Sequence, residues 1–156
     1  MGLRARGTTA SSYLWGELVF ASCLAVSRTP EHTRLAQRAS VTQAFSRTMF
    51  TSPMIHSSVR LICSGLVEKT HTHVFVPINT GHNHWVAMAF DGERRTVTYF
   101  DSLDQGTAEE AGYPDALRAL LPGYTWLNVR SRVQEDGATC GLWVAWAAEI
   151  WGRLHR

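Results

Sequence analysis

The chain has 156 residues and a formal net charge of +2, with 45% hydrophobic and 18% charged residues. This length fits one domain that buries its own core, and the composition excludes a largely disordered chain. The weak net charge, without a dense Lys/Arg tract, gives no reason to expect nucleic acid as a partner. No apolar stretch approaches the roughly 20 residues that span a bilayer, so no membrane partner is expected either.

The three cysteines indicate the compartment in which the protein works. Cys23, Cys63 and Cys140 are an odd number without the spacing of a disulfide framework. Such a set favours a reducing compartment, so we expect the nucleus or the cytoplasm.

The N-terminal region allows two interpretations. We expect residues 1–12, which are small, polar and basic, to be disordered, and residues 13–156 to form a single catalytic domain. The apolar run of residues 18–26 follows two arginines, as in a short secretory signal. Glu17 lies against this run and Cys23 dilutes it, which favours an ordinary amphipathic helix instead.

Helical signals dominate the first half of the chain and strand signals the second. Ser11 or Ser12 can cap a helix that runs to about residue 27, Thr29-Pro30 begins a helix that extends to about Phe45, and Ser52-Pro53 begins a third. Runs of apolar and β-branched residues then predict strands. These strands cover residues 73–79, 85–90, 96–100 and 125–129, and helices are expected at 107–121 and 142–154.

This order of elements predicts an α+β fold in which helices pack on a small, mainly antiparallel sheet. The last helix is apolar on nearly all sides, which is typical of a central, buried helix. Because residues 85–90 and 96–100 flank the short turn at Asp91-Gly92, they are expected to form a hairpin. There is no internal repeat or interdomain linker, and we expect a monomer.

Cys140 is the candidate nucleophile. It lies where the last helix begins, after a turn formed by residues 136–139 with Thr139 as a capping hydroxyl. The positive end of the helix dipole and unpaired amides favour the thiolate over the thiol there. Gly141 leaves room for the backbone of a substrate. The alternative is an inert core cysteine, since free cysteine is among the most buried residue types.

His84 and Asp101 are the candidate base and its orienting carboxylate. His84 precedes one strand of the expected hairpin and Asp101 follows the other, so both lie at the same open end. A carboxylate in that place can fix the imidazole tautomer and stabilise the imidazolium. Gln134, six residues before Cys140, could donate its amide to an oxyanion together with the Cys140 backbone N–H.

These residues resemble the ubiquitin-like-protein proteases, the group that includes SUMO proteases and adenovirus proteases, with a Ulp1-type C-terminal catalytic domain. The resemblance rests on Val76 to Asn79, His84-Trp85, Tyr99 to Ser102, and Gln134 with Cys140-Gly141. The spacing of 17 residues from His84 to Asp101 and of six from Gln134 to Cys140 is similar to the SUMO-protease branch.

The resemblance implies a papain-like cysteine peptidase fold in circularly permuted order, with the nucleophile on a buried central helix. It also implies cleavage after the Gly-Gly end of a ubiquitin-like modifier, in a precursor or an isopeptide conjugate, without a metal or organic cofactor. Trp85 would line the tunnel over the glycines, and Tyr13 would replace a tryptophan that begins the first helix of the family. Thr139 replaces the usual aspartate before the cysteine, and the N-terminal region looks short for the family.

Three other interpretations remain open. His71, His73, His82 and His84 form two His-x-His pairs around a strand, which is compatible with a metal site. Acetyltransferases of the same structural clan also use His, an acid and Cys in this order. A module that binds a ubiquitin-like protein without cleaving it is the third. The hypothesis that we carry forward is a cysteine peptidase whose partner is a ubiquitin-like protein or its conjugates.

Overall fold

The computed structural model describes residues 39–42, 44–51, 54–81, 84–130 and 132–155. Several predictions therefore lie outside the described residues: the disordered start, the first helix and most of the second. Tyr13, the predicted substrate-binding residue of the first helix, lies outside them as well.

Six strands form one mixed sheet, in the order β1-β3-β4-β5-β6, with β2 also paired to β3. The long central pairings, β3 with β4 and β4 with β5, are antiparallel, which confirms the predicted hairpin. Parallel pairings extend the sheet on both sides of these central strands: β1 and β2 pair with β3, and β6 pairs with β5. The strands are β1 (Ala39–Val41), β2 (Phe45–Ser46), β3 (His73–Asn79), β4 (Trp85–Asp91), β5 (Thr96–Phe100) and β6 (Thr125–Val129).

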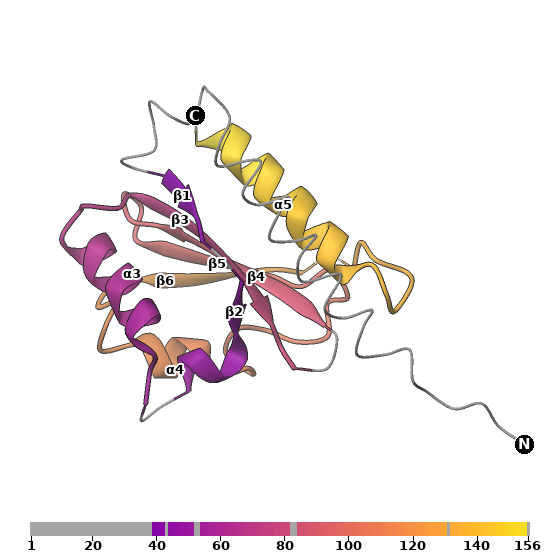
Figure 1. Ribbon diagram of the computed structural model, residues 1–156, viewed down its shortest axis with the longest axis horizontal. Coiled ribbons are helices and arrows are strands. Elements are labelled where there is room, and N and C mark those ends of the chain that lie inside the picture. Colours follow the sequence, from indigo (N-terminus) through magenta and orange to yellow (C-terminus); the bar gives the residue numbers. More distant parts are fainter. Residues whose placement is uncertain (1–38, 43, 52–53, 82–83, 131, 156) are drawn as a thin grey trace, which may run out of the picture.

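Helices cover both faces of this sheet (Figure 1). The long helix α5 lies on one face, and α3 and α4 lie on the other. The predicted α+β class, with helices packed on a sheet, is confirmed. The helices are η1 (Arg47–Phe50, a 3-10 helix), α3 (Ser57–Val67), α4 (Tyr113–Leu117) and α5 (Cys140–Leu154).

Strand β4 lies in the middle of the sheet and contributes to both cores. Met88 and Phe90 point into the larger core with α3 and α4, whereas Trp85 and Ala87 point into the smaller core with α5. Successive side chains of a strand point to opposite faces, so a strand covered on both faces has to be apolar almost throughout. The run from Trp85 to Phe90 meets that requirement.

Two predicted helices were wrong in part. The segment that was expected to be helical up to Phe45 contains the short strands β1 and β2 instead. The helix predicted at 107–121 is limited to the five residues of α4. The helix begins after Gly112, whose φ of 83° is left-handed, and it has Pro114 in its first turn. The residues before Gly112 that were predicted to be helical form turns instead.

Helix α5 begins at Cys140, two residues earlier than predicted, and is buried on one side rather than all round. Val144 and Ala148 are fully buried against the sheet, whereas Leu142 and Trp146 are each 49% exposed. The helix therefore docks on the sheet through a narrow stripe of small and medium residues. Among the described residues, the helix is buried mainly through the face that carries Cys140, Val144 and Ala148.

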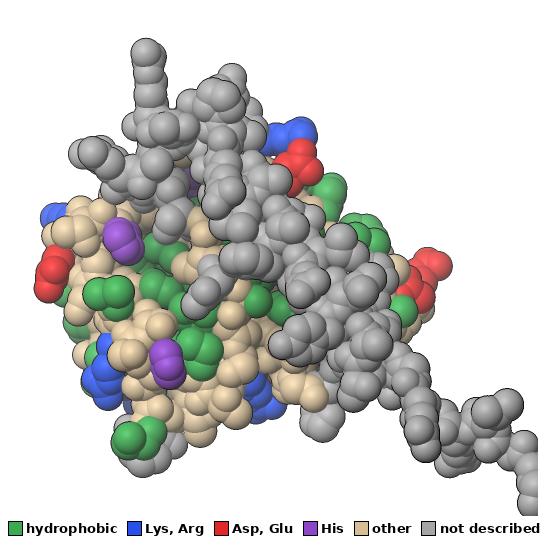
Figure 2. All heavy atoms as spheres, in the orientation of Figure 1, with side chains coloured by type: hydrophobic (Ala, Val, Ile, Leu, Met, Phe, Trp, Pro, Cys, Tyr) green, Lys and Arg blue, Asp and Glu red, His purple; other side chains and the backbone are tan. Residues whose placement is uncertain are grey.

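The described surface has mixed charge. On the face shown in Figure 2, acidic and basic side chains lie around the rim, some of them next to each other, and do not gather into one patch of a single sign. Among the described residues, none of the helices is both long and apolar enough to cross a membrane.

We predict that Leu117→Ala lowers the free energy of unfolding by about 2–5 kcal/mol, because it removes a fully buried side chain and leaves a cavity. Leu154→Ala is the matched control, since Leu154 is 75% exposed, and it should change this free energy by less than about 0.5 kcal/mol. Urea denaturation followed by circular dichroism measures both. Equal losses in the two variants would show that α4 does not anchor the larger core.

Candidate active site

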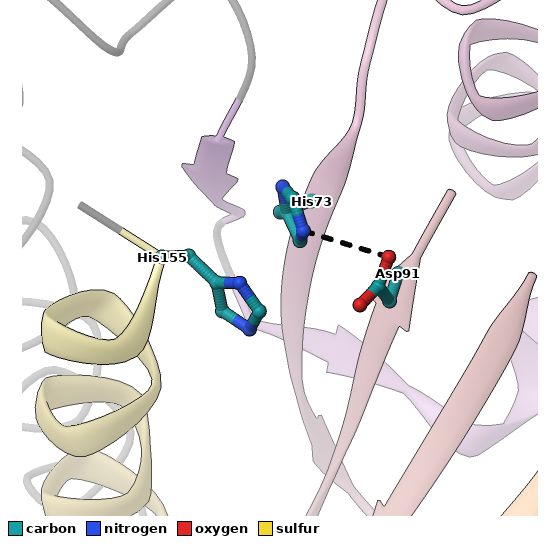
Figure 3. Close-up of side chains that lie close together, drawn as sticks. All are labelled: His73, Asp91 and His155. Atoms are coloured by element: carbon teal, nitrogen blue, oxygen red, sulfur yellow. Dashed lines mark ion pairs between the residues drawn. The ribbon is translucent and has the colours of Figure 1, made fainter. Parts of the chain in front are cut away.

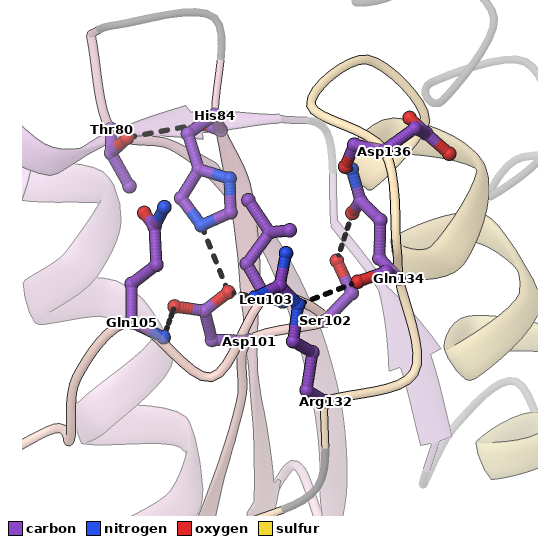
Figure 4. A network of polar contacts seen from close by, with 9 residues as sticks. All are labelled: Thr80, His84, Asp101, Ser102, Leu103, Gln105, Arg132, Gln134 and Asp136. Atoms are coloured by element: carbon purple, nitrogen blue, oxygen red, sulfur yellow. Dashed lines mark hydrogen bonds and ion pairs between the residues drawn. The ribbon is translucent and has the colours of Figure 1, made fainter.

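The structure brings His84 and Asp101 together at one end of the hairpin. Ala87 of β4 pairs with Phe100 of β5, so the residue before β4 and the residue after β5 lie side by side. The His84 Nε2 atom is 2.9 Å from Asp101 Oδ1 (Figure 4). Thr80 holds the other side of the turn, because its backbone N–H and its hydroxyl both donate to the His84 carbonyl.

Asp101 is held as a carboxylate. Its Oδ1 atom accepts the backbone N–H of Leu103 at 3.0 Å, and its Oδ2 atom accepts that of Gln105 at 3.2 Å. Burial is the largest single influence on its pKa and raises it. The hydrogen bonds from His84 and the two amides together outweigh burial, so the pKa of Asp101 lies below its ordinary value.

His84 is held as an imidazolium. The pKa of His84 is raised from 6.5 to about 9. The hydrogen bond with Asp101 is the largest cause of this rise, and the interaction with the Cys140 side chain is the second largest. Nε2 faces Asp101, while Nδ1 is buried and has no hydrogen-bond partner of full geometry among the described residues. The Cys140 side chain is thus close enough to interact with the imidazole.

Cys140 is buried and is the first residue of α5. It lies in the smaller core together with Trp85, Val144 and Ala148. Its place in the first turn puts the sulfur near the positive end of a 15-residue helix, as predicted from the sequence.

Asp136 shapes the loop that leads to Cys140. Its Oδ1 atom accepts the backbone N–H groups of Ala138 and Thr139, and its Oδ2 atom accepts the Thr139 hydroxyl at 2.7 Å. These hydrogen bonds, the one from Thr139 foremost, lower the pKa of Asp136. Thr139 occupies the N-cap position as predicted, but its hydroxyl bonds Asp136 and does not cap the helix. The sequence analysis did not assign this role to Asp136.

Gln134 is only 1% exposed, and its side-chain amide is fixed at both ends. The Ser102 hydroxyl donates to Oε1 at 2.6 Å, and Nε2 donates to the Asp136 carbonyl at 2.6 Å. The Ser102 carbonyl in turn accepts the backbone N–H groups of Val133 and Gln134. Gln134 is therefore tied directly to the residue that follows Asp101 (Figure 4). The side-chain amide nitrogen of Gln134 carries two N–H groups, and the hydrogen bond to the Asp136 carbonyl uses one of them.

The two described residues predicted to bind substrate are both buried. Trp85 packs between the sheet and α5 in the same core as Cys140, so its indole supports the helix that begins at Cys140. Gly141 follows Cys140 inside the first turn of α5. Their predicted contacts with substrate stay predictions.

Of the four histidines considered as a metal site, His82 lies outside the described residues, and His73 and His84 lie far apart. His73 begins β3 beside Asp91, whereas His84 precedes β4 at the opposite end of the same strand pair. A seven-residue strand is about 20 Å long, which is far beyond the reach of one ion. His84 is moreover engaged with Asp101. The chemistry that the described site offers is that of a thiol, an imidazole and a carboxylate, which is the set needed for acyl transfer through a covalent thioester.

Comparisons with known proteins agree with this arrangement. The family model described as the Ulp1 protease family, C-terminal catalytic domain, matches residues 68–124. A comparison with curated proteins gave no significant match.

Solved structures similar to this chain include members of that family. The yeast Ulp1 protease domain in complex with Smt3, the yeast ortholog of SUMO, has a TM-score of 0.64 at 17% identity over 89% of this chain and 64% of that one. The Xanthomonas campestris effector XopD, bound to ubiquitin, has a TM-score of 0.59 at 18% identity over 99% and 79%. The central domain of Lpg1148 from Legionella pneumophila has a TM-score of 0.55 at 18% identity over 71% and 64%.

This chain spans just under two thirds of the Ulp1 structure that it matches, and at these identities the likeness establishes the fold. The family model independently matches the segment that contains the hairpin, His84 and Asp101. The resemblance predicted from the sequence is therefore confirmed: residues 68–124 match the Ulp1-type family model, and the chain has the fold of the Ulp1 catalytic domain.

Proposed function

We propose that this chain is a cysteine peptidase that cleaves after the C-terminal glycine of a ubiquitin-like modifier. The observation that carries the proposal is the charged His84–Asp101 pair, 2.9 Å apart, with the Cys140 side chain acting on the same imidazole from the start of α5. A thiol at a helix N-terminus beside an imidazolium is the environment in which cysteine is nucleophilic. The names of similar structures suggest a modifier of the SUMO type, with ubiquitin as the alternative.

In the proposed reaction, the proton of Cys140 resides on His84, and the sulfur attacks the carbonyl carbon of the terminal glycine as a thiolate. The C–N bond then breaks as His84 gives that proton to the leaving amine, which leaves a thioester on Cys140. His84 next removes a proton from water, and the resulting hydroxide attacks the thioester carbonyl. The C–S bond then breaks, which releases the modifier with a free C-terminal carboxyl group and restores the Cys140 thiolate beside protonated His84. Asp101 keeps Nε2 engaged throughout, so that Nδ1 is the nitrogen that faces Cys140.

Gln134 is the proposed side-chain donor to the oxyanion, together with the backbone N–H of Cys140. Its support is positional: the residue is buried and held by Ser102, which directly follows Asp101. The side chain is therefore fixed relative to the His84–Asp101 pair before substrate arrives. Fixed donors of this kind stabilise developing charge without reorganisation, and loss of one costs about 3 kcal/mol of transition-state stabilisation.

Labelling by a C-terminal electrophile probe tests the nucleophile and the modifier together. We expect a SUMO-based or ubiquitin-based probe to label the wild-type chain and to leave Cys140→Ala unlabelled. Cys63→Ala is the matched control, because burial raises the pKa of Cys63 to about 12 and makes that thiol inert. Gel shift and mass spectrometry measure the adduct. Labelling that persists in Cys140→Ala would refute the assignment, and binding of a modifier without any labelling would favour the non-catalytic module.

The Asp101 carboxylate is expected to orient His84. Asp101→Asn keeps the size of the side chain but removes the charge that holds the imidazolium, so kcat should fall between about 10²-fold and 10⁴-fold. His84→Ala should abolish turnover. Asp115→Asn, at an exposed carboxylate of α4, serves as the control and should retain full activity. Cleavage of a fluorogenic modifier measures all three, and an Asp101→Asn variant with wild-type kcat would remove Asp101 from the mechanism.

The charge on His84 also predicts how stability depends on pH. Its pKa is about 9 in the folded state, against an ordinary value of 6.5, so the charged form stabilises the fold fully below pH 6.5. That contribution is lost as the pH rises through 9. The difference in unfolding free energy between wild type and His84→Gln should therefore be larger at pH 6 than at pH 10, as measured by urea denaturation with a reductant. A difference that does not change with pH would show that His84 is neutral in the fold.

A further inference from the structure

A second cluster of ionisable side chains lies at the end of the sheet opposite to His84. It consists of His73, Asp91 and His155, which come from the start of β3, the end of β4 and the residue that follows α5 (Figure 3). Each residue offers one nitrogen or oxygen atom, and these atoms all lie within 4.8 Å of one another. The peptidase mechanism uses none of the three.

The distance between His73 and Asp91 is unusual for an ion pair that is nearly buried. His73 Nε2 lies 3.5 Å from Asp91 Oδ1, and the two side chains are only 12% and 11% exposed. A charged hydrogen bond between such groups measures about 2.7–2.9 Å. Two ligands on a tetrahedral ion with bonds of 2.0–2.1 Å lie about 3.3 Å apart. The observed distance is therefore closer to the spacing of two metal ligands than to that of a direct hydrogen bond.

The other nitrogen of His73 already has a partner. His73 Nδ1 is 3.1 Å from the Thr72 hydroxyl, which can accept its proton. When Nδ1 donates to Thr72, the lone pair of Nε2 faces the Asp91 carboxylate, whose Oδ1 atom also accepts the backbone N–H groups of Glu93 and Arg94 at 3.0 Å and 2.9 Å. A cation between the imidazole lone pair and the carboxylate would remove the repulsion between them. Hydrogen bonding of the remote ring nitrogen is also what orients most metal-binding histidines.

His155 is the third member of the cluster. Its ring stacks on His73 with centroids 4.1 Å apart and also contacts Trp151, so its position over the strand pair is defined. It lies at the C-terminal end of α5, where the negative end of the helix dipole favours a cation. The competing cation is Arg94, which lies 3.4 Å from the other oxygen of Asp91 but is 78% exposed, and exposed pairs of this kind are weak.

We propose that His73, Asp91 and His155 form a binding site for a divalent transition-metal ion of the zinc class. Two imidazole nitrogens and one carboxylate oxygen are borderline ligands that suit zinc, cobalt and nickel, and they leave a fourth position for water. The ion would fasten the end of α5 to the β3–β4 pair. The site is independent of the proposed peptidase function, because it lies at the other end of the helix from Cys140.

Zinc titration of the untagged full chain tests this site. The Cys140→Ala background is used so that the active-site thiol cannot bind the ion. Isothermal titration calorimetry with Zn²⁺ should show one ion per chain with a dissociation constant in the micromolar range or below. His155→Ala should weaken zinc binding by about tenfold or more, because even the loss of a residue that only hydrogen-bonds a metal ligand lowers metal affinity by about tenfold or more. His71→Ala is the matched control, two residues before His73 and outside the cluster, and should bind within about twofold of the parent.

Thermal unfolding gives a second readout. Because Zn²⁺ binds the folded cluster and three ligands from separate elements are not assembled in the unfolded chain, it should raise the Tm of the parent and of His71→Ala but not of His155→Ala. His73→Gln, which retains a polar side chain of similar size, should behave like His155→Ala. The proposal is overturned if the parent binds no zinc, or if His155→Ala and His73→Gln bind it as tightly as His71→Ala does.

Discussion

The arrangement of this molecule depends on a central strand that is covered on both faces. Strand β4 packs Val86, Met88 and Phe90 against α3 and α4, and it packs Trp85 and Ala87 against α5. The side chains toward α5 include alanine, and Val144 and Ala148 meet them, so the helix can approach the strand closely. Close packing of this kind fixes the position of the helix along the strand. Cys140 is thereby held beside the end of β4 that His84 precedes.

The parts of the site that could be predicted from the sequence are those that depend on local pattern. The hairpin from Trp85 to Phe100 has a short turn, and its second strand, β5, alternates buried and half-buried side chains. Its register therefore follows from the chain itself, and the register puts His84 beside Asp101. Cys140 at the start of α5 follows equally from the turn before it and the apolar run after it. The α+β class needed only the order of such elements.

The parts that could not be predicted depend on contacts between distant segments. The Ser102–Gln134 hydrogen bond joins residues 32 positions apart, and nothing in either segment signals the other. The parallel pairing of β1 and β2 with β3 likewise overrides a helical pattern in residues 39–46. Intrinsic propensity is a weak prior in such short segments, and pairing to an exposed sheet edge decides the outcome. The same reasoning explains why α4 is short. The buried side chains of Tyr113 and Leu117 anchor this helix, and Gly112, in a left-handed conformation, directly precedes it.

The two ends of α5 present the same kind of side chains in two different geometries. At its start, His84 and Asp101 meet Cys140, and at its end, His73 and Asp91 meet His155. The first histidine and carboxylate are 2.9 Å apart, a distance that a shared proton on Nε2 spans, and the third group is a thiol that can exchange a different proton with Nδ1. The second pair is 3.5 Å apart, and its third group is another imidazole. Identical donors thus favour proton transfer at one end of the helix and cation binding at the other, because their spacing and their third partner differ.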